Sequence, residues 1–326
     1  MTEIFYLVQF IVGLVAIVKG ADWLTDGSAN VARYFGIPSI VVGLTIVAIG
    51  SSMPEFVVSV VSALQGNVDM ALGNVVGSNI FNILGIIGLT ALVKPIVVDR
   101  RNILYDVPFM VLSSLFIAIT SSDIFLDGAH KNVISRTDGL LMLCTFAVFI
   151  FYTFSIIRGK KENGEVAEDA NEPKPHIGKA ALFIIVGLGL LIFGGEWLVD
   201  GASGIAAWMG VPDSIIALTI VSAGTSAPEL AATLIAAKKG DTGLALGNIV
   251  GSVVFNVFYV LGVSATICPL GIGGVTEFDI FYLLGASVLM WTFCTFFGKA
   301  LKITRIEGGI MVLAAIAYYT YLVINA

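Results

Sequence analysis

The chain has 326 residues, of which 57% are hydrophobic and only 12% are charged, and its mean hydropathy is +0.98. An ordinary soluble domain carries about 25% charged residues, so this composition excludes a soluble globular protein and indicates a membrane protein. The 17 Lys and Arg residues against 23 Asp and Glu residues give a net charge of −6. No basic field is left to attract phosphates, which excludes a nucleic-acid partner.

Apolar windows of about 19 residues predict ten membrane-spanning helices and so an all-α polytopic membrane protein. In chain order the spans lie near residues 4–24, 38–64, 70–92, 104–121, 138–157, 178–198, 212–236, 243–268, 280–297 and 305–323. A charged run with two prolines separates the fifth span from the sixth and is typical of a solvated linker. We therefore expect a first five-span unit over residues 1–157, a linker over 158–177 and a second five-span unit over 178–326.

The two five-span units are copies of each other. They align without a gap at a constant shift of 174 residues from Gly20 to Pro95, and residues 41–82 and 215–256 are identical at about 19 of 42 positions. This identity indicates an internal duplication. Because each unit has an odd number of spans, the second copy must enter the membrane in the opposite orientation, which is the inverted-repeat plan of secondary transporters.

Basic residues beside the spans predict the orientation of the chain. Fourteen of them lie on one side of the predicted membrane and two, Lys131 and Arg136, lie on the other. The positive-inside rule then places the linker in the cytoplasm and both termini outside. We expect an integral protein of the plasma (inner) membrane.

Two spans carry a proline followed directly by a glutamate near the middle of the membrane. The motifs are Gly50-Ser51-Ser52-Met53-Pro54-Glu55 and Gly224-Thr225-Ser226-Ala227-Pro228-Glu229. Proline within a helix has no N–H and clashes with the carbonyl four residues earlier, so both helices should break at the midplane and free backbone oxygens there. Backbone of this kind is tolerated at that depth only where it lines a cavity or is buried in protein. The hydroxyl residues three and four positions before each glutamate share its helix face.

The span after each motif supplies further polar side chains. Ser78 and Asn82 lie four residues apart, as do Ser252 and Asn256, and Gly-x-x-x-Gly patterns at 73–77 and 247–251 should let the helices approach closely. Carboxylates, hydroxyls, amides and freed carbonyls form a hard oxygen site suited to Ca²⁺ or Na⁺. Both histidines lie outside the spans, which disfavours a zinc or copper site.

These motif pairs resemble the alpha repeats of the sodium/calcium exchanger family, of the prokaryotic type, within the calcium/cation antiporter superfamily. The resemblance covers nearly the whole chain. It implies that Glu55 and Glu229 are the central carboxylates of the calcium and sodium sites. It also implies that the other ligands are Ser51, Thr225, Ser52, Ser226, Ser78, Ser252, Asn82 and Asn256, together with the backbone carbonyls of Ala48 and Ser222.

One residue departs from the family pattern. Some members carry Asp where this chain has Asn256, so the ligand charge here is −2, which matches one Ca²⁺ but leaves a third sodium without its own carboxylate. We expect an antiporter that exchanges Ca²⁺ for a monovalent cation by alternating access, with Na⁺ as the leading coupling ion and H⁺ as the alternative. A cation channel is less favoured because one chain supplies both halves of the site.

An enzyme is not expected, since the spans contain no histidine and no His-Glu-x-x-His motif. We expect no permanent cofactor, and a monomer suffices for the site. Among the other acidic residues, Asp22 is expected to be neutralised by Lys19, three residues before it, and Asp106 is expected to make an interface contact.

Overall fold

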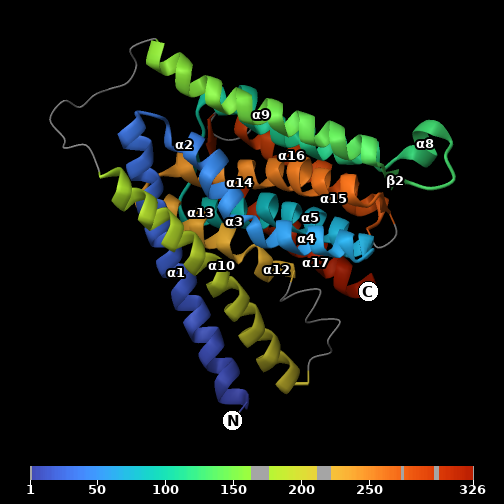
Figure 1. Ribbon diagram of the computed structural model, residues 1–326, viewed down its shortest axis with the longest axis horizontal. Coiled ribbons are helices and arrows are strands. Elements are labelled where there is room, and N and C mark those ends of the chain that lie inside the picture. The colour runs from blue at the N-terminus through green and yellow to red at the C-terminus, as the bar shows by residue number, and fades with distance from the viewer. Residues whose placement is uncertain (1, 163–175, 211–221, 273–274, 297–300, 326) are drawn as a thin grey trace.

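The computed structural model describes residues 2–162, 176–210, 222–272, 275–296 and 301–325, and these are almost entirely helical (Figure 1). The first half contains α1 (Thr2–Phe35), α2 (Ser39–Val42), the π-helical η1 (Gly43–Val47), α3 (Ala48–Ser51), α4 (Met53–Leu64), α5 (Val68–Ile80), η2 (Phe81–Ile86), α6 (Ile87–Val93), η3 (Asn102–Asp106), α7 (Val107–Thr120), α8 (Asp123–Asp127) and α9 (Arg136–Glu162). The second half contains α10 (Ile177–Trp208), α12 (Ser222–Thr225), α13 (Ala227–Lys239), α14 (Thr242–Phe255), η5 (Asn256–Leu261), α15 (Gly262–Ile267), α16 (Glu277–Thr295) and α17 (Arg305–Asn325).

Within the described residues, eight helices are long and apolar enough to cross a membrane. A bent pair, Ser39–Ser51 with Met53–Leu64, raises that number to nine if it forms one span. The all-helical membrane fold is therefore confirmed. The start of the expected seventh span falls on residues 211–221, outside the described residues, so the seventh span, and with it the total of ten, stays a prediction.

The core of the protein lies around the duplicated motifs. The span Thr242–Ile267 is 94% buried and the span Val68–Val93 is 78% buried, whereas the first, α9, α10 and α17 spans are buried over less than a third of their length. Large apolar side chains such as Ile11, Phe151 and Ile185 are exposed on these outer helices. An apolar outer surface around a polar-containing centre is the arrangement that a bilayer requires.

Helices α1 and α10 pack against each other along most of their length and extend away from the other helices (Figure 1). Glycines recur every seven residues on both, at 13, 20 and 27 on α1 and at 187, 194 and 201 on α10. A Cβ on Gly20 would lie 2.7 Å from the Gly187 carbonyl oxygen. The two backbones are thus in direct contact, as small residues permit in membrane helices.

Both motif-bearing helices are broken, as the sequence predicts, but the break lies just before each proline. Ser52 (ψ 13°) separates α3 from α4, and Ser226 (ψ 9°) separates α12 from α13. Pro54 and Pro228 therefore lie in the first turn of the following helix, where a missing N–H is tolerated.

Two short strand pairs link loops from the two halves of the chain. β1 (Ile96–Val97) pairs antiparallel with β4 (Lys302–Ile303), and β2 (Val133–Ile134) pairs antiparallel with β3 (Leu270–Gly271). Each pair joins two loops that the sequence places on the same side of the membrane.

The expected neutralisation of Asp22 by Lys19 is wrong. Lys239, at the end of α13, lies 2.6 Å from Asp22 and 2.7 Å from Asp26, so the ion pairs join α1 to α13. Asp106 is fully buried and accepts a hydrogen bond of 3.2 Å from the Tyr152 hydroxyl, and its expected place near the membrane interface stays a prediction. Both contacts join helices that are distant in sequence.

Candidate cation-binding site

The two helix breaks lie against each other and exchange hydrogen bonds. The Ser52 hydroxyl donates to Glu229 Oε1 at 2.7 Å, and the Ser226 hydroxyl donates to Glu55 Oε1 at 3.2 Å. All four side chains are fully buried. Each break therefore supplies the hydroxyl that holds the carboxylate of the other, and the two bonds are related by the shift of 174 residues.

Each glutamate keeps one carboxylate oxygen without a partner. Glu55 Oε2 and Glu229 Oε2 are buried and make no hydrogen bond among the described residues, and the two carboxylates are close enough to interact electrostatically. An ionised carboxylate buried without a counterion is very unfavourable. The pair therefore needs cations or protons when it is in the membrane.

Two asparagines hold the backbone that carries the glutamates. Asn74 Nδ2 donates to the Glu55 carbonyl at 3.2 Å and to Ser59 Oγ at 2.9 Å. Asn248 Nδ2 makes the equivalent bonds to the Glu229 carbonyl at 3.4 Å and to Thr233 Oγ1 at 2.9 Å.

Neither Asn74 nor Asn248 is among the site residues predicted from the sequence. A signal was available, because Asn74 and Asn248 are identical residues in the duplication and both of their hydroxyl partners are duplicated as well. The two hydrogen bonds of each asparagine fix the position of a glutamate relative to the helix that follows it.

The residues just before the breaks contribute in different ways. The Ser51 hydroxyl donates to Asn248 Oδ1 at 3.2 Å and also interacts with the Glu229 carboxylate. The Ala48 carbonyl accepts from Ser52 N at 3.1 Å, so part of its hydrogen-bonding capacity is used within the helix. Thr225 is half-buried at the end of α12, whereas Ser222 begins that helix and its side chain is outside the described residues.

The remaining predicted ligands lie where two buried helices change to π-helix. Asn82 is the second residue of η2 and Asn256 is the first residue of η5, and π-helical turns are frequent at functional sites. Ser78 interacts with the Glu55 carboxylate. Ser252 Oγ, Asn256 Oδ1 and both polar atoms of Asn82 are buried and have no partner among the described residues.

The Gly-x-x-x-Gly pattern of the second half packs against described backbone of the first half. A Cβ on Gly247 would lie 2.5 Å from the Ile40 carbonyl oxygen, and one on Gly251 would lie 2.7 Å from the Leu44 carbonyl oxygen, so α14 is in close contact with α2 and η1. Around Gly73 the nearest described atom to a Cβ would be on Val275, 3.7 Å away. The expected close approach is confirmed at Gly247 and Gly251; at 73–77 it stays a prediction, because residues 214 and 218, the equivalents of Ile40 and Leu44, lie outside the described residues.

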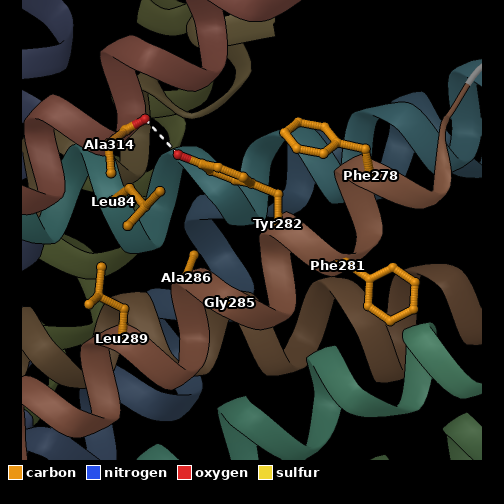
Figure 2. Close-up of a pocket in the computed structure, with 8 residues that line it drawn as sticks. All are labelled: Leu84, Phe278, Phe281, Tyr282, Gly285, Ala286, Leu289 and Ala314. Carbon is orange, nitrogen blue, oxygen red and sulfur yellow. Dashed lines mark hydrogen bonds between the residues drawn. The ribbon is translucent and has the colours of Figure 1, made fainter.

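A cavity of about 340 Å³ lies among α16, α17 and η2, and its lining is apolar (Figure 2). Leu84, Phe281 and Leu289 line it, and the one titratable side chain in its lining, Tyr282, donates its hydroxyl to the Ala314 carbonyl at 2.8 Å (Figure 2). This lining supplies no carboxylate or unpaired amide for a cation. The oxygen cluster around the helix breaks is therefore the better candidate site.

Comparison with known proteins agrees with this geometry. The model of the family described as sodium/calcium exchanger protein matches residues 5–155 and 179–324. CaxA of Alkalimonas amylolytica, named as a candidate antiporter, is 38% identical over 315 residues, which are 94% of this chain and 95% of CaxA. The sodium/calcium exchanger MaX1 of Methanosarcina acetivorans is 27% identical over 96% of this chain and 97% of its own. A solved structure of the sodium-calcium exchanger NCX_Mj aligns over 97% of this chain and 98% of that chain, with a TM-score of 0.83 and 29% identity.

Proposed function

The chain belongs to the sodium/calcium exchanger family, and from that premise we propose that it exchanges Ca²⁺ for Na⁺ across the membrane by alternating access. The observation that carries the proposal is the pair of buried glutamates at facing helix breaks, each with one oxygen that no described residue hydrogen-bonds. Two negative charges balance one Ca²⁺. Hard oxygen ligands are the ones that Ca²⁺ and Na⁺ prefer.

We assign Glu55 and Glu229 as the ligands shared by both ions. The neutral ligands in this proposal are Ser51, Ser52, Ser78, Asn82, Thr225, Ser226, Ser252 and Asn256, with the carbonyls of Ala48 and Ser222. The contacts of Ser52 and Ser226 with the glutamates and the unpartnered oxygens of Ser252 and Asn256 support this assignment.

The proposed architecture is ten spans in two inverted five-span units, over residues 1–157 and 178–326, joined by a cytoplasmic linker. It is supported by the hydrogen bonds that recur at a shift of 174 residues and by the strand pairs β1–β4 and β2–β3. We place the chain in the plasma (inner) membrane with both termini outside. A single chain holds both glutamates, so a monomer suffices.

Proton coupling is the second candidate. It is favoured by one observation, the neutral amide of Asn256, because two protons would neutralise the two glutamates as completely as one Ca²⁺ does. In that case the exchange would be of one Ca²⁺ for two protons. A channel is less favoured, because channel filters are normally gathered from several subunits.

Calcium uptake into vesicles that contain the purified protein tests both candidates. We expect ⁴⁵Ca²⁺ uptake when Na⁺ is loaded inside and absent outside, and only background uptake when K⁺ replaces Na⁺. Uptake driven by a proton gradient but not by a Na⁺ gradient would assign H⁺ as the coupling ion.

The glutamate variants locate the site in the same assay. Glu55→Gln and Glu229→Gln keep the size of the side chain and remove its charge, so we expect each to lower uptake to background. Asp127→Asn removes a charge from an exposed residue of α8 and should transport like the wild type. Full uptake by both glutamine variants would show that the site lies elsewhere.

A further inference from the structure

Asn79 is a buried polar residue that lies next to the proposed site but outside its ligand set. It lies on α5 and is fully buried. The equivalent residue of the second half, 174 positions later, is Val253, which has no polar side-chain atom. The duplication therefore does not require an asparagine here, and its amide needs another explanation.

The hydrogen bonds of Asn79 determine which way its amide points. Asn79 Nδ2 donates to the Val253 carbonyl at 3.5 Å, and Asn79 Oδ1 accepts from Asn256 Nδ2 at 3.1 Å. A backbone carbonyl can only accept, so Asn79 must turn its nitrogen toward Val253. Its oxygen then faces Asn256 and admits only the nitrogen of that amide.

Because its nitrogen faces Asn79, the Asn256 amide turns its oxygen toward other parts of the protein interior. Asn256 Oδ1 is buried and has no partner among the described residues. Asn82, the equivalent residue of the first half, differs, because neither its oxygen nor its nitrogen has a partner among the described residues. The described contacts therefore orient the amide of Asn256, through Asn79, and do not orient that of Asn82.

We propose that Asn79 is a positioning residue that presents the carbonyl oxygen of Asn256, and never its nitrogen, to the transported cation. This inference rests on the proposed function. An amide nitrogen carries positive hydrogens that repel a cation, so an amide that is free to turn loses ligand quality. An amide already held in its bound orientation binds more tightly, because less freedom is lost on binding.

The test compares Asn79→Val with Asn256→Leu and with the double variant in the vesicle assay. Asn79→Val introduces the residue that the other half already carries, and removes both hydrogen bonds. We expect it to raise the KM for at least one transported cation by roughly three- to tenfold, as expected for loss of the one bond that orients Asn256, with a smaller change in kcat. The double variant should have the KM of Asn256→Leu alone, because Asn79 acts only through Asn256.

Ser114→Ala provides the control for a purely structural change. Ser114 is fully buried and bonds to Ser287 at 2.6 Å between α7 and α16. We expect Ser114→Ala to lower the Tm, leave each KM unchanged, and combine additively with Asn256→Leu. Should Asn79→Val fail to fold, Asn79→Thr takes its place in the same cycle, since it also removes the oriented amide.

The outcomes separate this inference from the proposed function. Wild-type KM values in Asn79→Val, or additive effects in the double variant, would overturn the positioning role while uptake still required Glu55 and Glu229. Uptake that is absent in the wild type, or independent of both glutamates, would instead reject the exchanger site itself. A second readout is the rise in Tm that Ca²⁺ or Na⁺ causes in the purified protein, which we expect Asn79→Val to reduce.

Discussion

At the scale of single residues, asparagine side chains connect the helices around the two breaks, because an amide can donate and accept at once. Asn74 and Asn248 donate to the backbone carbonyls of the two glutamates and to a hydroxyl one turn further along the same helix. The carboxylates are thereby held at a defined distance from the following helix. A site that distinguishes ions needs such fixed ligands.

We expect Asn248→Ala to destabilise the protein by about 1–3 kcal/mol, since it leaves the Glu229 carbonyl and Thr233 without their donor in a buried environment. Asn74→Ala should cost less, because Asn74 is only partly buried. Thermal unfolding in detergent measures both. Equal Tm values for Asn248→Ala and the wild type would show that the hydrogen bonds of Asn248 do not stabilise the fold.

At the scale of elements, the contact between α1 and α10 leaves no room for a side chain at its glycines. The glycines of each helix lie on the backbone of the other at intervals of seven residues, which equals two turns of helix. Lys239 holds α1 to α13 through Asp22 and Asp26, but these side chains are about a third to a half exposed, so the ion pairs contribute little to stability.

Gly20→Val tests the close contact. We expect it to lower the Tm strongly and to impair transport, because its Cβ would lie 2.7 Å from the Gly187 carbonyl oxygen and backbone cannot move aside cheaply. Gly189→Val is the matched control on α10, since no atom lies within 4 Å of the Cβ position there. Similar Tm values for the two variants would contradict the role of the glycines.

At the scale of the whole molecule, the strand pairs constrain how the two halves cross the membrane. β1 follows α6 and pairs with β4, which precedes α17, so the end of α6 and the start of α17 must lie on the same side of the membrane. β3 follows α15 and pairs with β2, which precedes α9, so the end of α15 and the start of α9 must also share a side. The sequence places the first pair inside and the second outside. Two five-span units of opposite orientation satisfy both constraints.

Cysteine labelling tests this topology. In a variant whose three native cysteines are replaced by Ala, Asn171→Cys in the linker should react only with a reagent that enters the cytoplasm. Asp127→Cys, which is exposed on α8, should react with an impermeant reagent from outside. Reaction of both from the same side would contradict the inverted plan.

Local patterns were enough to predict the membrane helices and the two breaks, and a comparison of the two halves of the sequence was enough to predict the duplication. Apolar length predicts a span whatever its neighbours are, and proline weakens a helix through its own ring. The glutamates could be predicted as site residues for the same reason, because Pro54-Glu55 and Pro228-Glu229 are local motifs that occur twice.

Only the tertiary structure decided which side chains meet. Ser52 bonds to Glu229 rather than to Glu55, and Lys239 rather than Lys19 pairs with Asp22. Asn79 orients Asn256. The duplication did not point to Asn79, because the equivalent residue of the second half is a valine. These contacts join residues 177, 217 and 177 positions apart, so they depend on how whole helices pack, and local spacing along the chain carries no information about that packing.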